Sequence, residues 1–212
     1  MNIKAWEVDT SHIFLDVFTK EKKMFSLDGK LKFINVDLDY LKALHDACPE
    51  VCYKPNGYDK KPFLGMIVNS KDRKYVIPLT SAKEKHKTWK DVDKEKYLVY
   101  EIIEKSDLCA EHIWVEKDGK AKHIMSAIDI KKMIPIKEGV YHQVNLNPDA
   151  TDTVEESKYK DLMNKEYSFC LKIIDEVISK ANELYESQMT TGKVKKYCCD
   201  FKTLEQVCDT YK

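Results

Sequence analysis

The chain has 212 residues, of which 43% are hydrophobic, and we expect one domain over residues 1–212 with an ordinary buried core. Lys plus Arg and Asp plus Glu both number 36, so no overall excess of charge draws the chain to nucleic acid or to an anionic membrane. The apolar runs are much shorter than the ~20 residues of a spanning helix, and the first residues lack the apolar core of a secretion signal. We therefore expect a cytoplasmic protein without a membrane partner.

The seven cysteines are an odd number at irregular spacing, which is not the pattern of a secreted disulfide framework. No histidine stands at zinc-ligand spacing beside the Cys48 and Cys52 pair or beside the adjacent Cys198 and Cys199. We expect free thiols, no metal ion and no cofactor.

In chain order, the first elements predicted are two apolar segments, residues 12–18 and 31–36, joined as a hairpin through a turn at 26–30. Residues 37–47 carry apolar side chains at helical spacing, and Pro49 ends the pattern. The sequence predicts a short amphipathic helix there.

The middle of the chain has the pattern of an antiparallel sheet. Residues 63–68 and 75–79 are apolar runs around a polar turn, which favours a pair of antiparallel strands. An Asp118-Gly119 dipeptide indicates a tight hairpin between two of the later strands. The remaining strands are expected at residues 97–103, 110–116, 121–127, 133–136 and 140–146.

Thr153 and Glu156 have the spacing of a capping box, and apolar residues then recur every three or four positions until Thr190-Thr191-Gly192. One long helix is expected, followed by a strand at 194–201 and a short helix at 203–211. The fold class is therefore α+β, with a strongly bent, mostly antiparallel sheet and packed helices. Alternating β-α units and glycine-rich phosphate loops are absent from the sequence.

Basic residues concentrate between positions 54 and 90, where ten of them against three acidic residues leave a local charge of +7. Aromatic residues interrupt this stretch, and the mixture is suited to phosphates and stacked bases. A solvated lysine-rich face would have the same composition, so composition leaves both interpretations open. The candidate RNA contacts are Tyr58, Lys60, Lys85, His86, Lys87 and Trp89.

Four motifs occur in a recognisable order. They are Lys61-Pro62-Phe63-Leu64-Gly65, Ile77-Pro78-Leu79-Thr80-Ser81-Ala82-Lys83, Met133-Ile134-Pro135-Ile136 and Val194-Lys195-Lys196-Tyr197-Cys198-Cys199-Asp200-Phe201. This arrangement resembles the ToxN/AbiQ family of type III toxin-antitoxin toxins from about Leu31 to the C-terminus, most specifically in the Pro-Leu-Thr-Ser-x-Lys segment. Residues 1–30 form an N-terminal extension to which we assign no role.

The resemblance implies a Kid/MazF-like barrel and a metal-independent endoribonuclease that cleaves A-rich RNA. It also implies inhibition by a repeated RNA pseudoknot, with which the toxin forms a closed ring, and phage defence by abortive infection. The partners would be this RNA antitoxin and the substrate RNA, with no protein antitoxin.

Residue by residue, the resemblance places the family's catalytic lysine at Lys61, its Thr-Ser pair at Thr80 and Ser81, and its next lysine at Lys83. An upstream tyrosine of the family corresponds to Tyr58, whose spacing to the following strand is one residue shorter here.

Cleavage of RNA without a metal requires a base for the ribose 2′-OH, an acid for the departing 5′-oxygen and cations near the phosphorane. Positive charge close by lowers a lysine pKa from about 10.4, so Lys61 near Lys83 fits the base or a phosphate clamp. Thr80 and Ser81 would donate hydrogen bonds to the transition state. His86 has the side chain that titrates closest to neutrality and is an alternative acid, or else an ordinary surface histidine.

Two other functions remain open from the sequence. One is an RNA-binding barrel that breaks no bond, and the other is a MazF-like toxin restrained by a protein antitoxin. Either would make the Pro-Leu-Thr-Ser-x-Lys segment a coincidence.

Overall fold

A computed structural model describes residues 25–54, 62–69 and 73–212. The predicted strand at 12–18, and with it the hairpin it would form, lies outside the described residues. So do the candidate site residues Tyr58, Lys60 and Lys61.

The described chain is an α+β structure, as expected, in which ten antiparallel strands join into one sheet that three α-helices cover. The strands are β1 (Phe25–Leu27), β2 (Phe33–Val36), β3 (Phe63–Asn69), β4 (Lys74–Ser81), β5 (Val92–Asp93), β6 (Lys96–Ile103), β7 (Ile113–Lys117), β8 (Lys120–Asp129), β9 (Ile134–Ile136) and β10 (Tyr141–Gln143). The helices are α1 (Leu38–Ala47), α2 (Val154–Thr191) and α3 (Phe201–Thr210), with short 3-10 turns η1 (Glu84–Thr88), η2 (Lys105–Asp107) and η3 (Ile130–Lys132).

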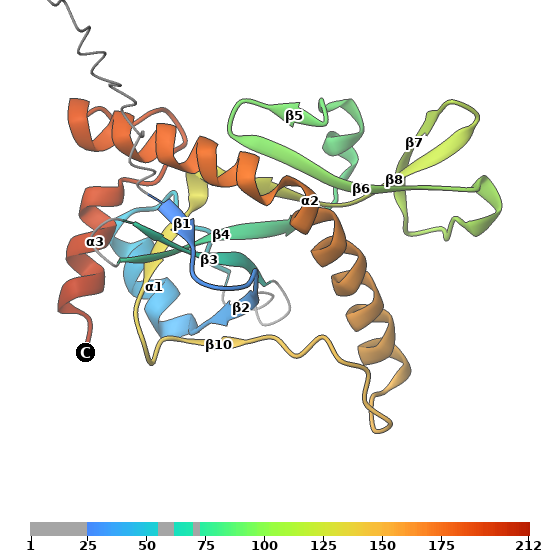
Figure 1. Ribbon diagram of the computed structural model, residues 1–212, viewed down its shortest axis with the longest axis horizontal. Coiled ribbons are helices and arrows are strands. Elements are labelled where there is room, and N and C mark those ends of the chain that lie inside the picture. Colours follow the sequence, from blue (N-terminus) through green and yellow to red (C-terminus); the bar gives the residue numbers. More distant parts are fainter. Residues whose placement is uncertain (1–24, 55–61, 70–72) are drawn as a thin grey trace, which may run out of the picture.

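The main path of the sheet runs β10-β2-β3-β4-β8-β6-β5, and β1, β9 and β7 pair beside β3, β4 and β8. Within the described residues the two ends of this path, β10 and β5, do not pair with each other. The sheet is therefore open, and the Kid/MazF-like barrel expected from the resemblance is not confirmed. Figure 1 shows the β6, β7 and β8 part extending away from the β2, β3 and β4 part.

Strand β4 connects the two parts because its partner changes along its length. Lys74 to Val76 pair with β9, whereas Leu79 to Ser81 pair with β8. Pro78, which has no backbone N–H to donate, lies in the gap between these two ladders. The change of partner places the end of β4, with Thr80 and Ser81, beside the C-terminal half of β8.

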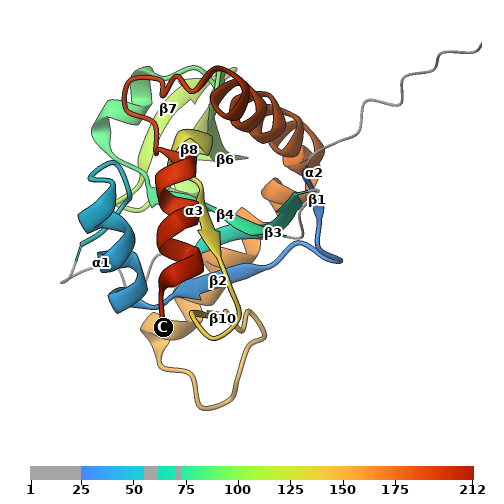
Figure 2. The same cartoon turned by 90° about the vertical axis from the view of Figure 1, so that its left-hand side faces the viewer.

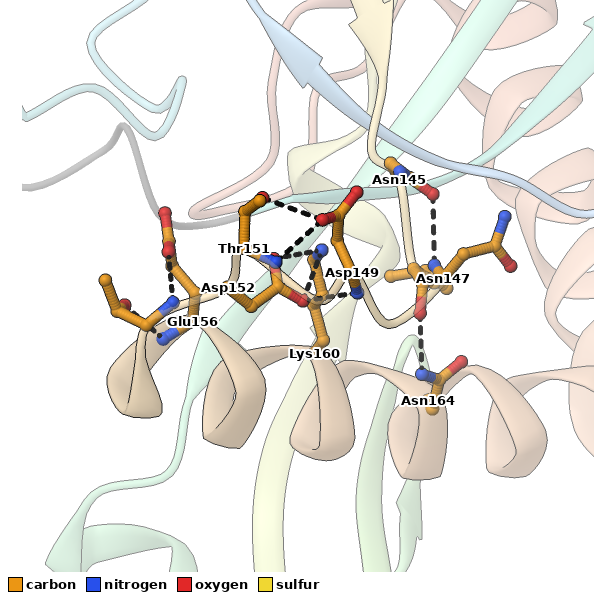
Figure 3. A network of polar contacts seen from close by, with 10 residues as sticks. Asn145, Asn147, Asp149, Thr151, Asp152, Glu156, Lys160 and Asn164 are labelled. Carbon is orange, nitrogen blue, oxygen red and sulfur yellow. Dashed lines mark hydrogen bonds and ion pairs between the residues drawn. The ribbon is translucent and has the colours of Figure 1, made fainter.

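Helix α2 begins at the predicted capping box. Glu156 N donates to Thr153 Oγ1 at 3.2 Å, and Thr153 N donates to Glu156 Oε2 at 2.8 Å. Figure 3 shows that the loop before the helix is tied to it, since Lys160 bonds Asp152 at 2.6 Å and Asn164 donates to the Leu146 carbonyl at 2.9 Å. The helix ends at Gly192, whose φ of 67° is left-handed. Both predicted ends of the long helix are confirmed.

The core lies between the sheet and the helices. Helices α1 and α3 lie side by side (Figure 2), and α3 also packs on β9. Phe25, Tyr75, Tyr185 and Phe201 are all buried and bring β1, β4, α2 and α3 together, with ring centroids 5.3 Å apart for Phe25–Tyr75 and 6.2 Å for Tyr75–Phe201. These contacts tie the C-terminal helices to the strand that carries Thr80.

Residues 194–201, predicted as a strand, do not form one. Tyr197 has a positive φ of 61°, and the segment is a loop that leads into α3. The buried side chain of Gln188 replaces a neighbouring strand, because its Nε2 donates to Cys199 O at 3.0 Å and its Oε1 accepts from Phe201 N at 2.7 Å. The strand prediction was wrong because a helix side chain satisfies these backbone groups.

The turn predicted at 26–30 is partly wrong, because Ser26 and Leu27 belong to β1, which pairs with β3, and the segment predicted at 31–36 is β2, which pairs with β3 and β10. The remaining predicted elements are found with small changes of boundary. The strands at 110–116 and 140–146 are shorter than expected, and the Asp118-Gly119 hairpin has the expected positive φ angles of 51° and 80°. The seven cysteines are free thiols, and no cluster of metal-binding side chains occurs among the described residues. None of the described helices is long and apolar enough to cross a membrane.

Gly65 has a φ of 65° at the irregularity in β3, and its N–H donates to Lys32 O at 2.7 Å. A Cβ there would lie 3.2 Å from Leu31 Cδ1, so we expect Gly65→Ala to lower the free energy of unfolding by about 1–2 kcal/mol or more. Urea unfolding measures the loss. Gly29→Ala is the control because Gly29 has a φ of 71° but open space around it, and an equal loss in both variants would contradict a role for the Leu31 contact.

Candidate functional site

Thr80 and Ser81 are the last two residues of β4 and lie opposite Ala127 and Ser126 of β8. Both are partly exposed. Thr80 Oγ1 donates to Ala127 O at 3.3 Å, whereas the Ser81 hydroxyl has no hydrogen-bond partner in the part of the chain that the structure describes. The pair therefore presents at least one hydroxyl that has no hydrogen-bond partner among the described residues. It does so at the end of a strand that pairs with neighbouring strands on both edges.

A small cavity of about 30 Å³ lies at this pair, with room for about one water molecule. Ser126 is 2% exposed, and its Oγ is the one buried side-chain oxygen or nitrogen atom in the described ranges that lacks a hydrogen bond. Besides Thr80 and Ser81, the cavity is lined by Pro62, Leu79, Met125, Ser126, Tyr159, Leu162, Met163 and Glu166. Helix α2 thus forms one wall beside the two hydroxyls.

A groove of about 610 Å³ begins at Ser81 and Ala82 and continues between the β7–β8 hairpin and the N-terminal half of α2. Ser81, Met125 and Leu162 line both the small cavity and this groove. The groove is further lined by Glu101, Cys109, Glu111, His112, Ile113, His123, Ile124, Lys158, Asp161 and Lys165. Ser81 therefore lies where a buried cavity meets an open groove of nucleotide size.

The turn η1 begins three residues after the end of β4 and carries Lys85, His86 and Lys87, with Lys83 and Trp89 at its two ends. Its centre is His86, which is 2% exposed and accepts a hydrogen bond from Lys83 N at its Nδ1, 3.1 Å away. Burial, together with the charges of Lys85 and Lys83, lowers the pKa of His86. The imidazole therefore packs inside the turn, with its centroid 4.4 Å from that of Trp89.

Cations surround the half-buried ring of Trp89. Lys96 Nζ lies 4.5 Å and Lys85 Nζ 5.6 Å from its centroid, both within the range of a cation–π contact. Lys83 and Lys85 are exposed, and Lys87 bonds Glu84 at 2.9 Å. We call Lys85, Trp89 and Lys96 the basic aromatic patch.

Thr80, Ser81 and Lys83 thus lie within four residues at the end of β4, with the patch just beyond them. Pro62 lines the cavity at Thr80, and its carbonyl accepts from Leu79 N at 3.3 Å. The chain position next to Lys61 is therefore at the cavity, although Lys61 itself lies outside the described ranges. Ser126 and Glu166 line the cavity but were not predicted from the sequence. Glu166 is 5% exposed, and the one sequence signal for its burial was its position near the apolar face of a predicted helix.

The fold is similar to that of solved toxins of bacterial type III toxin-antitoxin systems. One of these structures was described in a study of selective toxin inhibition by a non-coding RNA pseudoknot. It superposes on this chain with a TM-score of 0.63 at 22% identity, over 86% of this chain and 98% of that chain. AbiQ, described as a lactococcal anti-phage endoribonuclease of a type III system, gives a TM-score of 0.60 at 20% identity over 86% and 98%.

The sequence agrees with the fold. The model of the family described as toxin ToxN of type III toxin-antitoxin systems matches residues 32–209. Endoribonuclease ToxN of Bacillus thuringiensis subsp. kurstaki is 24% identical over 188 residues, which are 85% of this chain and 84% of the relative. Endoribonuclease ToxN of Pectobacterium atrosepticum is 25% identical over 179 residues, 83% and 91% of the two chains. The chain belongs to the ToxN family of type III toxins, which confirms the resemblance seen in its motifs.

Proposed function

We propose that this chain is an endoribonuclease toxin that cleaves A-rich RNA without a metal ion. A ribose 2′-OH would attack the adjacent phosphorus and expel the 5′-oxygen, leaving a 2′,3′-cyclic phosphate and a 5′-OH. The observation that carries the proposal is the position of Ser81 at the mouth of a groove of nucleotide size, next to Thr80, with which it lines the adjoining small cavity. The activity in the names of the two ToxN relatives supports the same conclusion.

We assign each residue a part in this reaction. Ser81 and Thr80 donate hydrogen bonds to the non-bridging oxygens, whose negative charge grows in the transition state. Of Lys61 and Lys83, one acts as the base that takes the proton of the 2′-OH, and the other, as an ammonium ion, clamps the phosphate and gives a proton to the departing 5′-oxygen. The contact of Pro62 with the cavity at Thr80 supports a place for Lys61 within reach of the phosphate.

The surface beside these residues would contact the RNA. We propose that Lys85, Lys87 and Trp89 bind the strand as it leaves the site, together with Tyr58 and Lys60. Phosphates would pair with the amines, and a base would stack on the indole. Because His86 is buried, we assign it the positioning of the η1 turn.

The proposed partner is a repeated RNA pseudoknot that inhibits the toxin in a closed toxin–RNA ring, with no protein antitoxin. Toxin released from this ring in the cytoplasm would then defend against phage by abortive infection. The pseudoknot inhibition described for the structural relative supports the partner. Purified from a cell that carries its own locus, the toxin should bring down a short repeated RNA; a small acidic protein in its place would favour the MazF-like alternative.

The activity is tested with A-rich RNA in the presence of EDTA. We expect cleavage to 2′,3′-cyclic phosphate and 5′-OH ends, and no cleavage of the same RNA with a 2′-deoxyribose at the cut site, because the nucleophile is then missing. Ends with a 3′-OH and a 5′-phosphate, or a strict need for a divalent ion, would contradict the mechanism. RNA that is bound but stays intact would favour the non-catalytic alternative.

A further inference from the structure

We propose that the groove between the β7–β8 hairpin and α2 is a pocket for one nucleobase that flanks the cut bond, and that it prefers a base with an exocyclic amino group. The inference rests on the proposed cleavage at Thr80 and Ser81 and specifies what binds next to it. Figure 1 shows the hairpin and the N-terminal half of α2 on the same side of the molecule.

The groove has the size and the position for this role. Its volume is about 610 Å³, and Ser81 forms part of its mouth. Ser126, opposite Ser81, and His123, in the groove wall, are three residues apart on β8, which is about 10 Å at ~3.3 Å per residue. A nucleotide next to the scissile phosphate spans such a distance, so its base can enter the groove while Ser81 contacts the phosphate.

The wall of the groove offers a stacking surface that is held in place. The rings of His112 and His123 are stacked, with centroids 3.8 Å apart and planes at 19°. Cys109 N donates to His112 Nδ1 at 3.2 Å. Glu101 holds His123, because its Oε1 lies 3.0 Å from His123 Nδ1 and also accepts from Lys165 at 2.9 Å. These hydrogen bonds outweigh burial and lower the pKa of Glu101, which keeps the carboxylate ionised. A rigid aromatic pair is suited to stack a base at little entropic cost.

Next to the rings the groove is apolar, with Ile113, Ile124 and Leu162 in its lining. Such side chains contact the faces and edges of a flat heterocycle but offer nothing to a phosphate. A base, rather than the sugar-phosphate backbone, is therefore the part of the nucleotide that fits.

The groove is lined by three carboxylates and two lysines, Lys158 and Lys165, so its charge differs from that of the lysine-rich turn. Two of its carboxylates, Glu111 and Asp161, are exposed and make no ion pair with any residue that the structure describes. Carboxylates repel a phosphate but accept hydrogen bonds from the amino groups of adenine, cytosine and guanine. Uracil has a carbonyl at the corresponding position, which a carboxylate disfavours. The chemistry therefore favours an amino-bearing base.

The experiment uses a short oligonucleotide with one ribose at the cut site and deoxyribose elsewhere. The nucleotide on either side of the cut carries adenine, unsubstituted purine, uracil or no base, one position at a time. For the parent we expect that loss of the base at one flanking position slows cleavage by about tenfold or more, the scale of one stacking contact. Loss of the amino group alone should give a smaller decrease at the same position.

Two variants test whether these decreases in cleavage rate arise from contacts in the groove. His112→Ala should cleave the adenine substrate as slowly as the parent cleaves the abasic one, and should show little further loss when the base is removed. A double variant, Glu111→Ala with Asp161→Ala, at two exposed positions, should cleave the adenine and purine substrates at equal rates. His142→Ala is the control, since His142 is an exposed histidine on β10 outside the groove, and it should behave as the parent.

The outcomes separate the two proposals. If the parent cleaves none of these substrates or ordinary RNA, the proposed function fails. If the parent cleaves but both variants keep its full dependence on the base and on the amino group, only the groove assignment is overturned. Faster cleavage of uracil than of adenine at the sensitive position would contradict the amino-group preference.

Discussion

Replacing Ser81 by alanine is expected to lower the rate of RNA cleavage by about 100-fold or more, with little change in RNA affinity. The loss of one preorganised donor to a developing negative charge has effects of roughly 10²–10³ in rate. Ser81 is suited to this part because its hydroxyl has no partner among the described residues and its strand is held by β3 and β8. Single-turnover cleavage with saturating protein measures the chemical step separately from binding.

Ser106→Ala is a matched control, because Ser106 is an exposed serine on η2, outside the groove. It should cleave at the parental rate. A double variant of Thr80 and Ser81 should be only modestly slower than the slower single variant if the two hydroxyls act on one phosphate, since residues that act as a unit are not additive. A Ser81→Ala protein that is folded and cleaves within threefold of the parent would remove Ser81 from the mechanism.

The second large effect concerns stability. Glu205 on α3 accepts hydrogen bonds from Tyr75 Oη and Tyr185 Oη, both at 2.7 Å, and its Oε1 lies 3.5 Å from Arg73 Nε. Glu205→Ala leaves two buried tyrosine hydroxyls without this acceptor. At about 1–3 kcal/mol for each unsatisfied group, we expect a loss of roughly 2–5 kcal/mol in the free energy of unfolding. Thermal unfolding should show a fall of about 5–15 °C in Tm.

Glu205→Gln is the informative comparison, because the amide oxygen still accepts from the tyrosines while the charge opposite Arg73 is lost. It should retain most of the stability. An equal loss in both variants would mean that the ion pair with Arg73, rather than the tyrosine hydrogen bonds, accounts for the effect of Glu205.

Elements with a strong local signal could be predicted from the sequence. The capping box at Thr153 and Glu156, the Asp118-Gly119 turn and the apolar runs of β3 and β4 each depend on residues close in the chain. The Thr80 and Ser81 pair could be named as a candidate for a similar reason, since a short motif contains both residues.

The rest depends on contacts between distant parts of the chain. The change of partner in β4 needs both β8 and β9, and the loop at 194–201 needs the Gln188 amide from α2. The groove combines β7, β8 and α2, so no short motif marks it. His86 could not be placed either, because a histidine in a lysine-rich stretch has the sequence of a surface residue, although here it forms the inside of a turn.

The contribution of α3 to the core has a consequence for synthesis of the toxin. Phe201 and Leu204 are fully buried against elements made much earlier, so the core cannot close until this helix has left the ribosome. The ribosome needs roughly 6–24 s to add the approximately 120 residues between Ser81 and Phe201, at about 5–20 residues per second. The hydroxyl pair is thus translated well before the scaffold that orients it, and a nascent toxin stays harmless for most of its own translation.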